Sequence, residues 1–493
     1  MAERIDALFI NPGDRRQVYQ SLGDEFSAIE PPVFAGLFAS FLRGKGRSAA
    51  ILDVPALGIT AEEAARIATE DFRATLIVIP VYGFQPSAST QNMGSSGKIA
   101  RLIKAARPDA RILMTGTHPA ALPERTMREE SVDFVCDREG PWTILKTLEA
   151  LDAAAGDFSA VPSLWWRNEG RIAAPLAAEP LIRDLDAEMP GIAWDLLPMD
   201  KYRAHNWHCF DDIGNRSPYA SIHTSLGCPY SCNFCCINAP FGKSSYRMWS
   251  PEKVVGEIDY LVERHGIRHI KIVDEMFVLN RAHVLGICDL LEKRGYDLNI
   301  WAYARVDTVE EDMLERMRRA GITWLALGIE SASEEVRDGA SKKLRGADIV
   351  STVRMIQAAD INIIGNYIFG LPDDTHEKMQ ETLDLALELK CEFANLYSAM
   401  PYPGSKLYAS ALAEGMPLPE SWHQYSQHAY DCTPLPNAHL SSAEILAFRD
   451  QAWNTCFTDP GYLAMVERKF GPAVVEHIGR MVAMPLPRKL TAA

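Results

Sequence analysis

Short apolar runs alternate with helical stretches over the first 150 residues. In the first helical stretch, Phe34, Leu37, Phe38 and Phe41 recur at helical spacing. Apolar runs that alternate with helices predict a parallel, doubly wound sheet in a Rossmann-like domain. The runs expected to be strands are 5–12, 48–54, 74–82, 110–116 and 132–137.

The pattern weakens after residue 150 and then returns in a different form. Residues 151–216 hold prolines, acids and a hairpin-like stretch at 161–175, which predicts a connector. From about residue 217, six further apolar runs are each followed by a helical stretch, and six such units form an open barrel rather than a closed one of eight. The barrel runs are 220–226, 268–274, 299–304, 323–330, 362–370 and 393–399.

Four segments follow from this division of the chain. We expect a Rossmann-like domain at 1–150, a connector at 151–216, a partial barrel at 217–410 and a small helical region at 411–493. Within the last region, 420–432 gathers His, Trp and Tyr, which suits either a helical cap over the barrel or a pocket lining. Ligands of parallel sheets bind at the carboxyl ends of the strands, so the loops there are the first place to look for chemistry.

Composition narrows the function classes. The 493 residues are 47% hydrophobic and 23% charged, which indicates a globular protein of two or three domains. The net charge of −15 makes nucleic acid and anionic membrane surfaces poor partners. The sequence shows no signal-peptide pattern and no apolar run of about 20 residues, so we expect a cytoplasmic protein without stable membrane insertion. The chain has ten cysteines, and in the reducing cytoplasm they are not expected to form disulfides.

A cysteine cluster follows the first barrel run. The stretch GCPYSCNFCC places Cys228, Cys232 and Cys235 at C-x3-C-x2-C spacing, with Cys236 beside them. Zinc normally takes a fourth ligand at similar spacing, and no second Cys or His pair follows. Three thiolates around a four-iron cluster leave one iron open to a substrate or cofactor. A zinc knuckle and a redox-active thiol group are the alternatives, and Cys236 is expected to pack in the core.

These residues resemble the signature of the radical S-adenosylmethionine (SAM) enzymes. The resemblance covers about 217–410 and continues through DEMF, ARVD, GIES and IFGLP after the next four strands. It implies a [4Fe-4S] cluster on Cys228, Cys232 and Cys235, with SAM on the open iron. Cleavage of SAM by an electron from the cluster then gives a 5′-deoxyadenosyl radical, which abstracts hydrogen from a substrate.

The resemblance also implies residues that contact SAM. Asp274 and Glu275 stand where relatives meet the methionyl amino group, although VDEMF replaces the Gly-Gly-Glu triplet of many relatives. Arg305 suits the carboxylate, while Glu330 and Ser331 suit the ribose hydroxyls. Phe234 lies near the adenine by the family pattern, and Gly370 lets backbone approach it closely. A helix cap or an ordinary salt bridge is the alternative for these polar residues.

The N-terminal region resembles the cobalamin-binding domain that precedes the barrel in a large subset of this family. PPVFAGLFASFL, GTHPAALPE and REGPWTIL carry the match, together with IAWDLLPMDKY in the connector. The Asp-x-His-x-x-Gly motif that supplies an axial histidine is absent, so cobalamin is expected without a histidine below cobalt. A domain that no longer binds cobalamin is the alternative. The cobalamin contacts expected are Ser87, Ser89, Thr90, Gly116, His118, Glu139 and Gly140.

Together the resemblances imply a cobalamin-dependent radical SAM enzyme. The leading prediction is a C-methyltransferase that moves a methyl group from methylcobalamin to an unactivated carbon of a small molecule. The alternatives are a non-methylating cyclisation, rearrangement or oxidation, and an iron–sulfur sensor or electron carrier without catalysis. A reductant such as flavodoxin or ferredoxin is the expected partner.

Overall fold

The N-terminal region folds around a seven-stranded sheet. We describe a computed structural model, which covers residues 3–83, 86–153, 156–344 and 348–491. The strand order is β2-β1-β3-β4-β5-β6-β7, and the first five strands are parallel, as predicted. The strands are β1 (Glu3–Asn11), β2 (Ala49–Asp53), β3 (Phe72–Val81), β4 (Ile112–Gly116), β5 (Phe134–Cys136), β6 (Leu164–Asn168) and β7 (Arg171–Ala173).

Helices cover both faces of this sheet because both faces of its strands are apolar. Along β1, Phe9 packs into one cluster with helices α3 and α10, while Leu8 and Ile10 pack into the other with α5 and α7. The helices are α1 (Arg15–Tyr19), α2 (Leu22–Glu25), α3 (Val33–Gly44), α4 (Val54–Leu57), α5 (Ala61–Glu70), α6 (Pro86–Gln91), α7 (Met93–Ala106), α8 (Thr117–Ala121), α9 (Pro123–Glu129) and α10 (Pro141–Asp152).

The connector is less separate than its composition suggests. Its predicted hairpin is β6–β7, which extends the N-terminal sheet as two antiparallel strands. The rest of the connector is short helical turns that run to the barrel, and Trp207 in the last of them packs against Trp301 and Trp324 of the barrel. These turns are α11 (Leu185–Glu188), η1 (Trp194–Leu196), η2 (Met199–Lys201) and η3 (Trp207–Asp212).

The six predicted barrel strands form one parallel sheet in the order β15-β14-β13-β12-β11-β8. They are β8 (Tyr219–Ile222), β11 (His269–Ile272), β12 (Asn299–Arg305), β13 (Ile322–Glu330), β14 (Asn362–Phe369) and β15 (Phe393–Ser398). The first predicted run splits in two, because β9 (Ser225–Leu226) leaves the sheet and pairs with β10 (Arg247–Met248). The cysteine loop lies between β9 and β10, with the short turn η4 (Ala239–Phe241) inside it.

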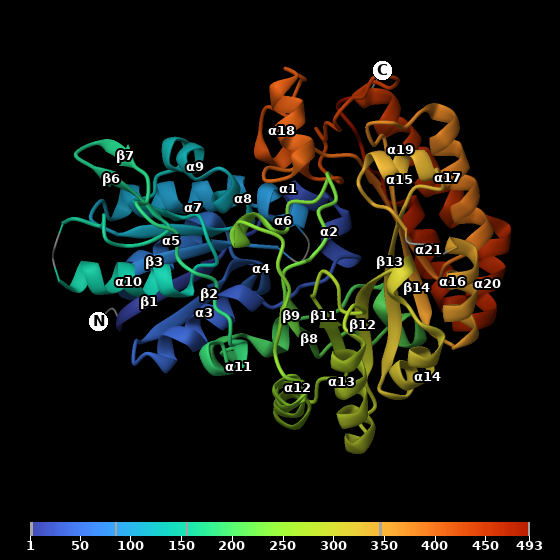
Figure 1. Ribbon diagram of the computed structural model, residues 1–493, viewed down its shortest axis with the longest axis horizontal. Helices are drawn as coiled ribbons and strands as arrows, with labels where there is room; N and C mark the ends of the chain where they lie inside the picture. The colour runs from blue at the N-terminus through green and yellow to red at the C-terminus, as the bar shows by residue number, and fades with distance from the viewer. Residues whose placement is uncertain (1–2, 84–85, 154–155, 345–347, 492–493) are drawn as a thin grey trace.

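Helices follow the barrel strands and cover the outside of the sheet, as βα units require. They are α12 (Pro251–His265), α13 (Arg281–Arg294), α14 (Glu311–Arg319) with the turn η5 (Val306–Thr308) before it, α15 (Glu334–Gly339), α16 (Ile349–Ala358) and α17 (His376–Leu389). Figure 1 shows the N-terminal sheet on the left and the curled barrel sheet on the right, so that the two sheets lie side by side.

The C-terminal region is helical, as expected. It holds α18 (Lys406–Ala413), the turn η6 (Trp422–Tyr425), α19 (Ser442–Thr458), α20 (Pro460–Phe470) and α21 (Pro472–Ala483). Helix α19 packs against β15 and β14 beside the barrel (Figure 1). The His- and aromatic-rich stretch 420–432 forms only the turn η6, and Trp422 of this turn packs edge-on against His118 with ring centroids 4.3 Å apart. Among the described residues, no helix is both long enough and apolar enough to cross a membrane.

Candidate functional site

Three adjoining cavities lie between the N-terminal sheet and the barrel. The cysteine cavity, of about 280 Å³, is lined by Cys228, Cys232 and Cys235 together with Glu275 and Arg305. The edge cavity, of about 110 Å³, is lined by strand ends of the N-terminal sheet, such as Asn11–Gly13 and Tyr82. The barrel cavity, of about 450 Å³, is lined by inward-facing residues of β11, β12 and β15, such as Lys271, Tyr303 and Asn395.

Residues of the N-terminal domain reach the cysteine cavity. Phe34, Tyr82, Gly83 and Thr117 all line it, opposite the cysteine loop. The rings of Phe34 and Tyr82 stack with centroids 3.7 Å apart and form a flat apolar shelf. Phe34 and Tyr82 also line the edge cavity, so the carboxyl ends of the N-terminal strands open toward both cavities. A flat shelf at the strand ends suits a planar ring system.

The three predicted cluster ligands come from one loop and line one cavity. All three are free thiols and are partly buried, whereas Cys236 is fully buried in the core, as predicted. Burial raises the pKa of the Cys228 thiol to about 11. Among the described residues, no three His, Cys, Asp or Glu side chains are already close enough to hold a metal ion. The fit to an iron–sulfur cluster therefore rests on donor chemistry, because three thiols share one cavity, and their role as ligands stays a prediction.

The two acidic residues at the end of β11 have different surroundings. Asp274 is fully buried and accepts hydrogen bonds from Thr224 N at 2.6 Å, Thr224 Oγ1 at 2.5 Å and Ser225 Oγ at 2.6 Å. It does not line the cysteine cavity, whereas Glu275 does. The Glu275 Oε2 atom is buried and has no hydrogen-bond partner among the described residues. Burial raises the pKa of Glu275 to about 7. An unpaired carboxylate oxygen beside the thiols suits an ammonium group.

Members of two ion pairs, Arg305 and the Glu330–Lys342 pair, line the same cavity beyond Glu275. Arg305 donates from Nε to Asp307 Oδ1 at 2.8 Å, and its guanidinium lies 4.1 Å from the ring centroid of Tyr230. Glu330 forms a buried ion pair with Lys342, which sequence reasoning missed. Lys342 belongs to the loop after α15, so only the fold brings it to the strand end.

Ser331 and Gly370, by contrast, do not line the cysteine cavity. Ser331 is fully buried and pairs with Thr382 Oγ1 at 3.1 Å. Gly370 has φ +82°, and a Cβ added there meets Ile445 of α19 at 2.6 Å. The close approach predicted for this glycine is thus made by the chain itself. Phe234 does line the cavity, and it packs beside Ile368 near the small cluster around Val336 and Leu371.

His223 is a second residue that sequence reasoning missed. It follows β8 directly, its ring lies against Phe34 with centroids 5.3 Å apart, and it lines both the edge and the cysteine cavities. Its Nδ1 is 3.5 Å from Asp274 Oδ1, and its Nε2 is buried without a hydrogen-bond partner among the described residues. The one signal in the sequence is a histidine at a strand end, five residues before Cys228.

The predicted cobalamin contacts on α6 and α8 bond mainly with one another. His118 N donates to Ser89 Oγ at 2.9 Å, and His118 Nδ1 is 3.2 Å from Thr90 Oγ1. Burial lowers the pKa of His118 to about 3, so its ring is neutral. Ser87 lies in α6, and its side chain is outside the described part of the chain.

The other predicted cobalamin contacts also serve the fold. Gly116 has φ +131°, and a Cβ there meets the Val81 carbonyl oxygen at 2.2 Å. Glu139 pairs with Arg247 of β10 at 2.7 Å and accepts from Ile182 N at 3.0 Å, while Gly140 precedes α10. None of Ser89, Thr90, Gly116, His118, Glu139 or Gly140 lines the edge, cysteine or barrel cavity, so their contact with cobalamin stays a prediction.

Comparison with protein families finds two matches. Residues 222–386 match the radical SAM superfamily, and residues 20–145 match the B12 binding domain. An uncharacterized methyltransferase of Pyrococcus horikoshii is 30% identical over 397 residues, which cover 80% of this chain and 82% of that protein. The anaerobic magnesium-protoporphyrin IX monomethyl ester cyclase of Rubrivivax gelatinosus is 25% identical, covering 81% of this chain and 69% of the relative.

Solved structures share the fold. The radical SAM methyltransferase TsrM of Kitasatospora setae, solved with tryptophan and a SAM analogue, is 16% identical and matches with a TM-score of 0.67, covering 97% of this chain and 99% of that one. The cobalamin-dependent SAM radical enzyme OxsB is 19% identical and matches with a TM-score of 0.62, covering 84% of this chain and 56% of that one. The fold match therefore includes both the N-terminal sheet and the barrel.

Proposed function

This chain belongs to the radical SAM superfamily and carries a B12 binding domain, and on that premise we propose that it transfers a methyl group to a carbon atom of a small molecule. Its cofactors are a [4Fe-4S] cluster, SAM and cobalamin. When bound, the cluster and SAM supply a radical that abstracts hydrogen, and cobalamin supplies the methyl group. One observation carries the proposal: the cysteine loop and the strand ends of the N-terminal domain line one cavity.

Different residues of this cavity bind the cluster and SAM. Cys228, Cys232 and Cys235 supply three thiolates to the cluster, and Glu275 Oε2 accepts from the ammonium group of SAM. Arg305 keeps its guanidinium at the cavity wall, where its charge favours a carboxylate.

The N-terminal domain and the Glu330–Lys342 pair of the barrel also line this cavity. The Phe34–Tyr82 shelf presents an apolar surface to cobalamin, and the ion pair presents polar atoms to ribose hydroxyls. Both sets of contacts hold the reacting groups together in one cavity, and this placement is the protein's main contribution to the reaction.

The partner and location follow the family. Radical SAM enzymes act on small molecules and take electrons from an external reductant. We propose a flavodoxin or ferredoxin as that reductant and a cytoplasmic location. The net charge of −15 supports the absence of a nucleic-acid partner.

A non-methylating reaction is the second candidate, because one relative is named as a cyclase. Product analysis separates the two. A methyltransferase forms both 5′-deoxyadenosine and S-adenosylhomocysteine, whereas a cyclase, rearrangement enzyme or oxidase forms 5′-deoxyadenosine alone. The sensor alternative is disfavoured because these relatives are named as enzymes.

The first test is retention of corrinoid. The full chain is purified without oxygen, reconstituted with iron and sulfide, mixed with hydroxocobalamin and desalted. We expect one corrinoid per chain in the visible spectrum, and then S-adenosylhomocysteine after addition of SAM and a reductant. An intact cluster without retained corrinoid would overturn the methyl-transfer proposal and favour the non-methylating reaction.

A further inference from the structure

The barrel cavity lies next to both cavities that are lined by cofactor residues. It shares Tyr303, Tyr397 and Gln427 with the cysteine cavity, and it shares Glu30 and His205 with the edge cavity. The reaction needs a third molecule besides SAM and cobalamin, and this cavity is the largest of the three. We propose that the barrel cavity binds the substrate, and that the substrate has a compact, flat apolar body with one anionic group held by Arg449. This inference rests on the proposed function.

Arg449 supplies the group that recognises an anion. Its side chain is 5% exposed and lines the cavity, donating from Nε to the Leu396 carbonyl at 2.7 Å and from Nη1 to Asp450 Oδ1 at 2.8 Å. No hydrogen bond of its Nη2 occurs among the described residues. Asp450 is shared with Arg488, which donates to its two oxygens at 2.9 and 3.0 Å. Two guanidinium groups thus face one carboxylate, which leaves one positive charge uncompensated.

The opposite wall contributes no net charge. Lys271 Nζ lies 3.2 Å from both oxygens of Glu30, so these two charges cancel. Burial lowers the pKa of His205, so its imidazole beside Glu30 is neutral at pH 7. The charged residues that line the cavity, Glu30, Lys271, Arg449 and Asp450, therefore cancel, and the excess positive charge comes from Arg488, which shares Asp450 with Arg449 but does not itself line the cavity. A buried charge of this kind favours a ligand with a single negative charge, such as a carboxylate.

The walls of the cavity suit a flat apolar body. Aromatic side chains supply much of the lining, and Trp301 Nε1 is a buried donor without a partner among the described residues. A volume of about 450 Å³ lies in the range of cavities that hold small organic ligands. The aromatic residues that form these walls are Trp207, Trp301, Tyr303, Phe393, Tyr397 and Trp453.

Two parts of the barrel cavity, the anion site at Arg449 and the border with the cysteine cavity, set the orientation of the substrate. The anionic group lies at Arg449, next to α19, while Tyr303, Tyr397 and Gln427 form the border with the cysteine cavity. Gln427 is fixed there because its amide exchanges two hydrogen bonds with the backbone of Ser398, at 2.9 and 3.0 Å. The carbon that reacts is therefore the one that faces this border.

A matched pair of probes tests the anionic group. 1-Naphthaleneacetate and 1-naphthaleneacetamide share a flat body and differ in charge, and calorimetry measures their binding to the reconstituted full chain without SAM. We expect the acid to bind about 10- to 100-fold more tightly than the amide, as for a charge-assisted hydrogen bond. Arg449→Gln is expected to remove this preference, while Arg480→Gln, at a side chain 58% exposed, keeps it. Equal binding of the two probes to the unaltered protein would overturn the inference.

A second variant guards against misfolding of Arg449→Gln. Ala483 is exposed at the mouth of the cavity, so Ala483→Trp blocks the entrance without disturbing a buried contact. We expect it to weaken both probes at least tenfold with an unchanged circular dichroism spectrum, and unchanged binding would place the probes elsewhere. If corrinoid is not retained but the acid preference persists, the methyl-transfer proposal fails and the anion site stands. If both SAM products form without an acid preference, this inference alone fails.

Discussion

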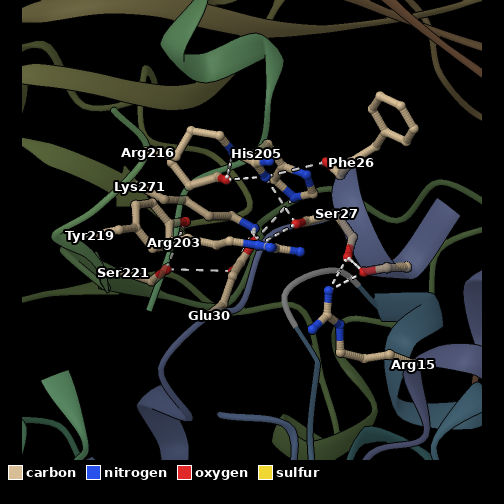
Figure 2. A network of polar contacts seen from close by, with 12 residues as sticks. Arg15, Phe26, Ser27, Glu30, Arg203, His205, Arg216, Tyr219, Ser221 and Lys271 are labelled. Atoms are coloured by element: carbon tan, nitrogen blue, oxygen red, sulfur yellow. Dashed lines mark hydrogen bonds and ion pairs between the residues drawn. The ribbon is translucent and has the colours of Figure 1, made fainter. Parts of the chain in front are cut away.

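Glu30 of the N-terminal domain and Lys271 of the barrel strand β11 form a buried ion pair across the domain junction. Both oxygens of Glu30 lie 3.2 Å from Lys271 Nζ, and each side chain is only 3% exposed. Figure 2 shows the pair with His205 and Ser221 around it. Burial opposes the charge of Glu30, but Lys271 and His205 outweigh it and lower the pKa of the carboxyl group. The pair fixes the position of one sheet against the other.

Removing one partner of this pair should destabilise the protein strongly. Lys271→Met or Glu30→Gln leaves the other charge buried and unpaired, which costs about 3–5 kcal/mol of unfolding free energy. The double variant should lose much less than the sum, because no buried charge remains. Urea unfolding of the full chain, followed by circular dichroism, measures this coupling.

An exposed ion pair provides the control. Arg281 and Asp312 pair at 2.6 Å with side chains 45% and 64% exposed, so Asp312→Asn should cost at most about 1 kcal/mol. Additive losses at Glu30 and Lys271 would contradict an interaction between the two charges.

Four cysteines lie close together in the cysteine loop, and substitution of three of them should prevent binding of the cluster, whereas substitution of the fourth should not. Cys228→Ala, Cys232→Ala and Cys235→Ala are each expected to abolish most of the visible absorbance of the cluster and the bound iron and sulfide. Cys236→Ala is the matched control, because this buried thiol is next in the chain to Cys235 and does not line the cavity. Equal loss of iron in the Cys236 variant would argue against the assignment of ligands.

Adjacent residues at strand ends show what the sequence predicts and what it does not. Apolar runs located all six barrel strands, because burial on both faces leaves a strong pattern. The pairs Asp274–Glu275 and Glu330–Ser331 were both predicted to face SAM, yet only one member of each lines the cavity. The other member of each pair is bonded within the fold instead, Asp274 to Thr224 and Ser225 and Ser331 to Thr382, and neither set of partners is close in sequence.

Contacts between residues far apart in the sequence account for the other differences between the predicted site and the structure. Lys342 and Arg449 reach the cavities from a loop and from α19, and neither has a local motif that marks it. Gly370 lies in the motif IFGLP. The position needs a glycine because a Cβ there would meet Ile445, which is 75 positions further along the chain. Sequence patterns predict secondary-structure elements and ligands that are close in sequence. Ion pairs between distant elements are seen only in the folded structure.

Glu275 and Asp274 should respond differently to removal of charge. Glu275→Gln removes the carboxylate that faces the cavity, and a charge-assisted hydrogen bond is worth about 1.5–3 kcal/mol, so SAM should bind about 10- to 100-fold more weakly to the cluster-loaded protein. Asp274→Asn should instead lower the unfolding free energy, because its two oxygens hold Thr224 and Ser225. Equilibrium dialysis with labelled SAM measures the first effect, and unchanged SAM affinity in Glu275→Gln would remove this residue from the site.

Gly370→Ala should destabilise the protein through two separable causes. The positive φ of +82° costs a residue with a Cβ about 1–2 kcal/mol, and the contact with Ile445 adds about 1–3 kcal/mol of overpacking. Gly266→Ala is the control for the first cause, because it has φ +63° and no atom within 4 Å of the added Cβ. Thermal unfolding of both variants gives the difference, and SAM affinity below the transition should stay unchanged. A loss of SAM affinity in folded Gly370→Ala would place this glycine against the adenine after all.

The carboxyl group of Asp53, at the edge of the N-terminal sheet, should make the unfolding free energy depend on pH. Its side chain is buried, with Oδ1 accepting from Asn11 Nδ2 and Oδ2 accepting from the Tyr202 hydroxyl of the connector, both at 2.8 Å. Burial raises its pKa to about 6, although these hydrogen bonds oppose the shift. The folded protein therefore binds this proton more tightly than the unfolded chain does, since the ordinary pKa is 3.8.

The sign of the effect follows from that difference. The contribution of Asp53 to the unfolding free energy is greatest below pH 4, falls by about 1.4 kcal/mol per pH unit up to pH 6, and is constant above, for a total of about 3 kcal/mol. Asp53→Asn keeps the size of the side chain and cannot titrate, so the difference in unfolding free energy, unaltered protein minus variant, should fall by that amount between pH 4 and 7. Urea unfolding at pH 4, 5, 6 and 7 measures it. A constant difference across this range would mean that Asp53 is ionised in the folded protein throughout, and that its hydrogen bonds outweigh its burial.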